Sequence, residues 1–215
     1  MERFLKWSAP VLVCCAAALT AVTIKQEVAI PRSRSPQRVS DWRSYAERGQ
    51  RLGPASAPVT VVVFSDYECP FSRRLAEDLR TIQSEMPSMV SVVYRHYPLK
   101  NHAQAVNAAA AVECAARQGR FRELHDLLTT SVWDNLGAPS WAAFASHVGI
   151  QDTLAFARCM ASPGIAALIE ADRIAGRKLG VPATPTMLVN DQKYVGMPGN
   201  LDKIVRVAAA KAARN

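Results

Sequence analysis

One cysteine followed by a proline is the feature of this sequence best suited to covalent chemistry. Cys69, Pro70, Phe71 and Ser72 lie where an apolar run, residues 59–64, gives way to a stretch with helical periodicity. Backbone N–H groups at a helix N-terminus have no partner within the helix and favour a thiolate over a thiol. Cys69 is therefore predicted to be a nucleophile. The alternative is a buried, inert cysteine beside an N-terminal proline.

Ser72 stands three positions after Cys69 and limits what that cysteine does. Its hydroxyl is placed to donate a hydrogen bond to a Cys69 thiolate, but it cannot attack a disulfide. Cys69 is able to form a mixed disulfide with a client protein or with glutathione, provided that a thiol from outside resolves it. Without that thiol, the chemistry stops at a long-lived mixed disulfide or a sulfenic acid.

The elements that must position Cys69 follow from the hydrophobic pattern. Residues 59–64 are continuously apolar and β-branched, as in a central strand covered on both faces. Leu75, Leu79 and Ile82 then form one apolar stripe on a helix that ends at Pro87. Residues 89–94 supply a second strand. Because a helix intervenes, the two strands are predicted to be parallel, in a right-handed βαβ unit.

The second half of the chain has a different pattern. Residues 103–180 are almost entirely helical in periodicity and contain no strand-like run, which predicts a large helical insertion. Residues 186–189 and 193–196, joined by a turn at Asn190, predict a β-hairpin. Leu201, Ile204 and Val205 lie on one face of a closing helix. The order βαβ, helical block, ββα places the chain in the α/β class.

The segment around Cys69 carries a family resemblance. Residues 64–72, Phe-Ser-Asp-Tyr-Glu-Cys-Pro-Phe-Ser, resemble the active-site segment of DsbA-like thioredoxin-fold proteins, which usually carry Cys-Pro-x-Cys there. Residues 181–186, Val-Pro-Ala-Thr-Pro-Thr, resemble the cis-proline loop of that family. Gln118-Gly119-Arg120-Phe121, together with His125-Asp126, resembles its helical insertion. The resemblance extends from about Val59 to the C-terminus.

The resemblance implies a thioredoxin fold, βαβ–ββα, with the helical block inserted between its two halves. It also implies that Pro185 takes the cis form and that the Thr184 backbone, beside Cys69, binds a substrate peptide as an added strand. This chain departs from the family at Ser72, where the second cysteine normally closes an intramolecular disulfide or releases a trapped substrate. A dithiol cycle is therefore not available to Cys69.

Two further cysteines, Cys114 and Cys159, lie in the predicted insertion. In an exported domain, two cysteines that lie in the same subdomain and outside the proposed active site predict a structural disulfide. Two separate buried thiols and a second redox pair are the alternatives. The four histidines show no metal-ligand spacing, so we expect no metal site. No bound cofactor is expected either, apart from an external glutathione or partner thiol.

The N-terminus predicts export or membrane attachment. Residues 8–24 form an apolar run after Glu2, Arg3 and Lys6, as in a signal peptide or a signal anchor. The run is near the lower length limit for spanning a bilayer. No clear small-x-small cleavage site ends it before Lys25, which favours a retained anchor. The predicted organisation is a signal anchor or signal peptide (1–27), a linker (28–53) and the DsbA-like domain (54–215).

Charge argues against nucleic-acid binding. The formal net charge is +8, but nine of the 26 Lys and Arg residues and only four of the 18 Asp and Glu residues fall within residues 1–53. The folded part is only mildly basic and shows no basic stripe of the kind that nucleic acids require. The Arg-rich linker is predicted instead to be a solvated tether or to contact anionic lipid headgroups.

Two functions fit these observations. The first is an extracytoplasmic thiol–disulfide exchange protein, periplasmic and held at the inner membrane, that acts on cysteine-containing clients through Cys69. In that case glutathione or a partner redoxin supplies the resolving thiol. The second is a non-catalytic thioredoxin-fold module whose cis-proline groove holds peptides or a membrane partner, with Cys69 incidental.

Overall fold

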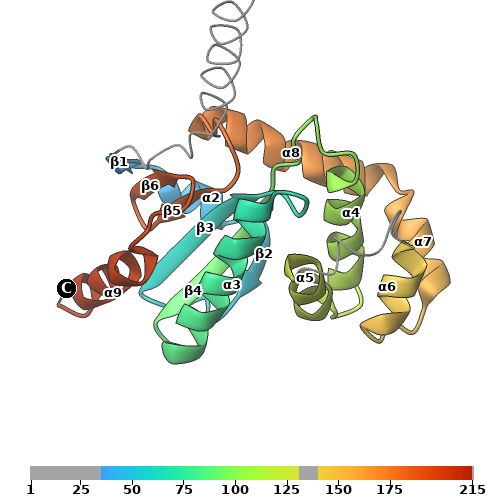
Figure 1. Cartoon of the computed structure of the whole chain (residues 1–215), viewed down its shortest axis with the longest axis horizontal. Helices are drawn as coiled ribbons and strands as arrows, with labels where there is room; N and C mark the ends of the chain where they lie inside the picture. Colours follow the sequence, from blue (N-terminus) through green and yellow to red (C-terminus); the bar gives the residue numbers. More distant parts are fainter. Residues whose placement is uncertain (1–34, 131–139, 215) are drawn as a thin grey trace, which may run out of the picture. The chain divides into compact units, whose positions relative to one another are not determined.

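A six-stranded mixed sheet forms the centre of the computed structural model (Figure 1), which describes residues 35–130 and 140–214. The strand order is β1-β6-β5-β3-β4-β2, and only the β3–β4 pair is parallel. The strands are β1 (Gln37–Arg38), β2 (Gln50–Leu52), β3 (Val59–Ser65), β4 (Val90–His96), β5 (Thr186–Val189) and β6 (Gln192–Val195).

The predicted βαβ unit is confirmed. Helix α3 (Pro70–Glu85) connects β3 to β4, and Val59 pairs with Val90 at the start of the parallel ladder. The apolar stripe of α3 is buried, because Leu75, Leu79 and Ile82 all face the sheet side of the helix. The strand therefore leads directly into a helix whose first turn carries the Cys-Pro-Phe-Ser stretch.

The closing ββα unit is also present as predicted. Strand β5 pairs antiparallel with β3, and the β5–β6 hairpin turns at Asn190, whose φ of 49° is a left-handed conformation that asparagine tolerates. The Asn190 side chain accepts a hydrogen bond from the Thr60 backbone at 2.8 Å, which ties the turn to β3. Helix α9 (Leu201–Ala212) follows, with Leu201 and Val205 buried.

Within residues 105–130 and 140–179, the described part of the predicted insertion, there are five helices. Figure 1 shows them running from the end of β4 to the start of β5. They are α4 (Ala105–Ala116), α5 (Phe121–Thr129), α6 (Trp141–His147), α7 (Thr153–Met160) and α8 (Pro163–Leu179). Helix α8 ends at Gly180, whose φ of 69° forms the left-handed C-cap for which glycine is suited.

The predicted linker over residues 28–53 needs correction in its second half. Residues 37–52 contain β1, the short helix α2 (Trp42–Ala46) and β2. Strand β2 pairs with β4 and β1 pairs with β6, so these residues belong to the sheet rather than to a tether. Both are edge strands of only two or three residues and mostly polar composition. They are therefore too short to show the hydrophobic alternation by which a strand is predicted from sequence.

Alternate residues of the central strands belong to two different hydrophobic clusters, one on each face of the sheet. Val61 and Val63 of β3 pack with α3, α9 and the insertion. Val62 and Phe64 pack on the opposite side with Tyr45 of α2 and Leu179 of α8. This explains why residues 59–64 are continuously apolar, as expected of a strand that is covered on both faces.

The predicted membrane segment, residues 8–24, lies outside the described residues. Within residues 35–130 and 140–214, no single helix is long and apolar enough to cross a membrane. Helices α7 and α8 meet that requirement only as a pair, and they are bent by 55° relative to each other.

Candidate functional site

Cys69 is the N-cap residue of α3, with extended backbone angles, and Pro70 opens the helix. Its side chain is buried at 5% exposure, and Sγ lies 3.3 Å from the carbonyl oxygen of Thr184, to which the thiol donates. Within the described residues, Cys69 is the one cysteine outside a disulfide. The sulfur therefore lies at the end of α3 where backbone N–H groups have no partner within the helix.

The loop before β5 supplies the other half of the site. The Thr184–Pro185 peptide bond is cis, as the resemblance implied. The loop is fixed on both sides, because the Thr186 hydroxyl donates to the Ala183 carbonyl at 2.7 Å and Gly196 N–H donates to the Pro185 carbonyl at 2.8 Å. The structure thus brings Cys69 and Thr184, which are distant in sequence, into contact.

The Thr184 hydroxyl is the unusual polar group of this loop. Thr184 is 7% exposed, and no hydrogen-bond partner from the described residues reaches its Oγ1 atom. Buried hydroxyls are nearly always hydrogen-bonded, because an unpaired one costs roughly 1–3 kcal/mol. A hydroxyl in this state, next to Cys69, is a group that a bound molecule is able to satisfy.

Ser72 lies in the first turn of α3, buried at 2% exposure, and its Oγ accepts a long hydrogen bond of 3.4 Å from Asp66 N–H. This contact forms because the chain turns back between β3 and α3, which places Asp66 over the first turn of the helix. Donation by the Ser72 hydroxyl to a Cys69 thiolate stays a prediction. Phe71, by contrast, is 41% exposed beside this turn.

A buried aromatic group lies behind the Cys69 turn. The Tyr67 hydroxyl and His125 Nδ1 are 2.9 Å apart, and the His125 ring lies 4.1 Å from the ring of Tyr94, centroid to centroid. Burial lowers the pKa of His125 to about 3, and burial also raises the pKa of Tyr67 well above its ordinary value. Both groups stay uncharged near neutral pH, so His125 acts in packing.

The cysteines of the insertion form a disulfide. Cys114 of α4 and Cys159 of α7 are bonded, with an S–S distance of 2.03 Å and Cα atoms 5.8 Å apart. Cys114 is fully buried in the larger hydrophobic cluster, so the bridge fastens α7 to the core of the insertion.

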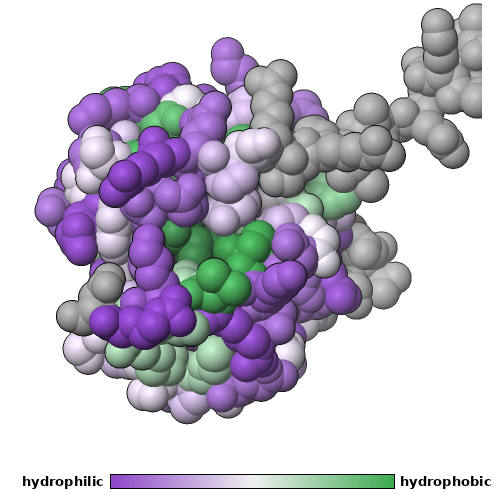
Figure 2. All heavy atoms as spheres, turned by 90° about the vertical axis from the view of Figure 1, so that its left-hand side faces the viewer, coloured by the Kyte–Doolittle hydropathy of each residue, from purple (hydrophilic) through white to green (hydrophobic). Residues whose placement is uncertain are grey.

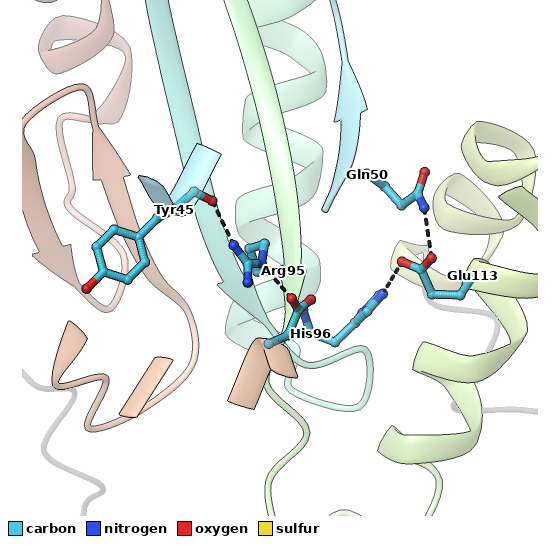
Figure 3. Close-up of polar contacts among 6 residues, drawn as sticks. Tyr45, Gln50, Arg95, His96 and Glu113 are labelled. Atoms are coloured by element: carbon cyan, nitrogen blue, oxygen red, sulfur yellow. Dashed lines mark hydrogen bonds and ion pairs between the residues drawn. The ribbon is translucent and has the colours of Figure 1, made fainter. Parts of the chain in front are cut away.

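A second polar cluster was not predicted from the sequence (Figure 3). Arg95 and His96, at the end of β4, point to opposite sides of the strand: Arg95 pairs with Asp172 at 2.6 Å, and His96 with Glu113 at 2.8 Å. Gln50 donates to the same Glu113 carboxylate. Burial raises the pKa of Glu113, but the hydrogen bonds from His96 and Gln50 outweigh it and leave the pKa below its ordinary value.

This cluster is structural. It joins β4 to α4, α8 and β2, and all its carboxylate oxygens have donors. A sequence signal that could have indicated it is charge in otherwise apolar surroundings, such as Glu113 within the alanine-rich α4. No group of three or more His, Cys, Asp or Glu residues that could hold a metal ion occurs within the described ranges.

A groove of about 670 Å³ lies elsewhere, between α9, the β5–β6 turn and α2. Figure 2, which views the molecule from that side, shows hydrophobic residues in a hollow ringed by hydrophilic ones. Val207, which lines it, is 58% exposed. The groove includes no residue of the Cys69 site, so volume alone does not locate the chemistry of this protein.

Comparison with known proteins places the fold in a family. A family model described as Thioredoxin matches residues 46–206. The chain belongs to the thioredoxin family. The crystal structure of a thioredoxin-like oxidoreductase from Silicibacter pomeroyi is 28% identical, with a TM-score of 0.64, covering 77% of this chain and 92% of that one. The thioredoxin fold implied by the sequence is thereby confirmed.

Two further comparisons extend this result. The thiol–disulfide exchange protein alpha-DsbA2 from Wolbachia pipientis shares the fold at 18% identity and a TM-score of 0.67, covering 80% of this chain and 92% of that one. The Na(+)/H(+) antiporter NhaA 3 from Salinispora tropica is 35% identical over 74% of this chain. This chain spans only about a quarter of that antiporter's length, 24%.

Proposed function

We propose that this protein is a thiol–disulfide exchange protein that acts through the single cysteine Cys69. The observation that supports this best is the pairing of the Cys69 sulfur, at the N-terminus of α3, with the Thr184 carbonyl of the cis-proline loop. A substrate peptide that lies along this loop as an added strand has its own sulfur beside Cys69. The unpartnered Thr184 hydroxyl offers that peptide a further hydrogen bond.

The reaction is an exchange without net oxidation or reduction. The Cys69 thiolate attacks one sulfur of a client disulfide, the client S–S bond breaks, and the other client sulfur leaves as a thiolate. Because Ser72 cannot complete the cycle, a second thiolate from outside, glutathione or a partner redoxin, attacks the client sulfur of the mixed disulfide. Cys69 then leaves as a thiolate, and the client keeps the outside thiol as a new disulfide.

We further propose an extracytoplasmic location, in the periplasm, with anchoring to the inner membrane through residues 8–24. The Cys114–Cys159 disulfide supports it, because structural disulfides persist in oxidising compartments. The relative named as an antiporter carries a segment similar to this chain within a protein that moves ions across a membrane, which also supports a position close to one.

One observation favours a second candidate, a binding module in which Cys69 is incidental. Cys69 is only 5% exposed and its thiol is already hydrogen-bonded, so an incoming sulfur must displace the Thr184 contact. In this case the cis-proline loop binds peptides without forming covalent bonds.

Trapping of clients separates the two candidates. Extracts are quenched in acid and alkylated, and the proteins disulfide-linked to the full-length chain are compared for the wild type and Cys69→Ala. Exchange predicts Cys69-dependent mixed disulfides and a Cys69-dependent reaction with a chromogenic disulfide in the purified protein. Client binding that survives Cys69→Ala unchanged, with no covalent adduct in the wild type, supports the binding module and rejects exchange.

A further inference from the structure

Asp66, the residue directly after β3, has a carboxylate that is fully enclosed and has three hydrogen-bonding neighbours. Its side chain is 0% exposed. Oδ1 accepts from Glu68 N–H at 2.8 Å, and Oδ2 accepts from Leu99 N–H at 2.8 Å. The same Oδ2 lies 2.9 Å from His102 Nδ1. A carboxyl group has two acceptor oxygens, so it is able to accept from several donors at once.

The backbone of Asp66 holds the Cys69 turn as well. Its carbonyl accepts from Cys69 N–H at 3.1 Å, and its N–H donates to the Ser72 hydroxyl. One residue therefore contacts the turn before Cys69, the backbone of Cys69 itself and the first turn of α3. The backbone direction of Cys69, and with it the direction of its sulfur, depends on this residue.

The carboxylate ties the turn to the segment that leads into the insertion, residues 97–104. Leu99 and His102 belong to this segment, and a second acidic residue reinforces the connection: the Glu68 carboxylate accepts from the N–H of Gln104, the N-cap residue of α4, at 2.5 Å. The segment is also fixed to β3, because Tyr97 N–H donates to the Ser65 carbonyl at 2.8 Å. The turn thus rests against a firmly held part of the chain.

From these contacts we infer that Asp66 is a positioning residue for Cys69: its enclosed carboxylate holds the turn against residues 97–104 so that the sulfur stays beside the Thr184 carbonyl. The inference rests on the proposed exchange function. Asparagine at this position has the same shape, but it has one acceptor oxygen in place of two and directs an NH₂ group at donors. At least one of the three contacts is then lost, and the turn loosens.

The test uses the full-length chain with Asp66→Asn and two readouts that are expected to move in opposite directions. The first is exchange with a synthetic peptide disulfide, whose kcat/KM is expected to fall by roughly tenfold to a hundredfold, because small misplacements of a reacting group have effects of this size. The second is alkylation of Cys69 by iodoacetamide in the native protein. It is expected to become severalfold faster, because the sulfur is released from the Thr184 contact.

Asp172→Asn is the matched control. Asp172 is also a buried carboxylate with hydrogen-bonded oxygens, 3% exposed, but its partners Arg95 and His96 lie outside the Cys69 turn. A general loss of stability is expected to be common to both variants, whereas the opposite movement of the two rates is expected only for Asp66→Asn. If both rates in Asp66→Asn stay within twofold of the wild type, or move as in Asp172→Asn, the inference is overturned.

His102→Gln provides a second test of the inference in case Asp66→Asn does not fold. His102 is partly exposed, and its removal takes away one of the three contacts, so the same opposite changes are expected at a smaller size. Unchanged rates in His102→Gln together with an unfolded Asp66→Asn reject a positioning role. Failure of the proposed function is recognised separately, as a wild type that shows no Cys69-dependent exchange, and alkylation still tests the position of the sulfur in that case.

Discussion

The sulfur of Cys69 lies 3.3 Å from the carbonyl oxygen of Thr184, a residue 115 positions further along the chain. The contact joins the βαβ half of the fold to the ββα half, across the antiparallel β3–β5 pair. The candidate site therefore exists only when both halves of the fold have come together. Substitutions around Cys69 are expected to act through this contact.

Ser72→Cys is expected to create a dithiol site. The new thiol occupies a position in the first turn of α3, three residues from the N-cap Cys69, the spacing of the Cys-Pro-x-Cys motif in the DsbA-like proteins that this chain resembles. When one of two thiols in a turn is held in a mixed disulfide, the other attacks that disulfide far faster than a free thiol does, because of its high effective concentration. We expect an internal disulfide between Cys69 and the introduced thiol after mild oxidation, and dithiothreitol-driven reduction of insulin. Both are expected to be absent from the wild type, whose internal disulfide joins Cys114 and Cys159.

Ser72→Ala is the control for this gain, since it removes the hydroxyl without adding a thiol. The outcome that counts against the prediction is a Ser72→Cys protein that folds normally but shows neither the internal disulfide nor insulin reduction. Such a result means that the turn does not hold the two side chains in a geometry that supports dithiol chemistry.

Thr184→Val is expected to stabilise the protein while slowing exchange. Valine has the shape of threonine without the hydroxyl, and the Oγ1 of Thr184 is buried without a partner among the described residues. Because an unpaired buried hydroxyl is unfavourable, the free energy of unfolding is expected to rise by about 1 kcal/mol. Exchange with a peptide disulfide is expected to fall several-fold, because the peptide loses a hydrogen bond. Urea unfolding and exchange kinetics measure the two effects.

Thr186→Val, two residues away, provides the matched comparison. The Thr186 hydroxyl donates to the Ala183 carbonyl, so the same substitution removes a made hydrogen bond and is expected to lower the free energy of unfolding by about 1 kcal/mol. If the two valine variants change stability in the same direction, the Thr184 hydroxyl has a partner in solution and the prediction for Thr184 is wrong.

The central elements of this fold were predictable because their patterns are long and strongly apolar. The buried run of β3 and the stripe of Leu75, Leu79 and Ile82 on α3 each determine one structure and one orientation. The edge strands were not predictable. Two-residue β1 and three-residue β2 are too short for any period, and they pair only because β6 and β4 present free edges to them.

Side-chain contacts of the site were predictable only in part. The strand-to-helix turn placed Cys69 correctly at the N-cap of α3. The contact of Ser72 with Asp66, and the position of His102 beside Asp66, depend on how residues 97–104 fold back over the turn. Such contacts between irregular segments have no periodicity in the sequence, and four histidines without metal spacing gave no indication of a partner for His102.

Removal of the insertion disulfide is expected to lower stability without abolishing the chemistry at Cys69. The Cys114–Cys159 bridge joins residues 45 positions apart, and a bridge of this kind contributes roughly 2–4 kcal/mol, largely by restricting the unfolded chain. We expect the double variant with alanine at both positions to lose that much free energy of unfolding. At a temperature where it remains folded, its exchange rate is expected to stay within a fewfold of the wild type.

Dithiothreitol provides the check on this assignment. It is expected to destabilise the wild type and to leave the double alanine variant unchanged, because the variant has no bridge left to reduce. Loss of Cys69-dependent exchange in a fully folded double variant is the contrary result, and it indicates that Cys114 and Cys159 take part in the redox chemistry.

His125 is expected to make the protein less stable in mild acid. Burial lowers the pKa of His125 to about 3, whereas an unfolded histidine titrates near its ordinary value of about 6.5. Below pH 6.5 the unfolded chain binds a proton that the folded chain does not, so the free energy of unfolding falls as the pH decreases towards 3. Between pH 7 and pH 5 the loss from this group is about 2 kcal/mol.

His125→Gln removes the titrating ring and keeps a polar group for Tyr67, so it is expected to be less stable at pH 7 but to lose this slope. The lowered pKa of Glu113 has its effect only below that residue's ordinary value of about 4.5, and the comparison between pH 7 and pH 5 avoids it. His147→Gln, the same substitution at an exposed histidine of α6, is expected to keep the slope of the wild type. Urea unfolding at the two pH values measures all three proteins, and a slope unchanged in His125→Gln contradicts the buried, neutral state of this ring.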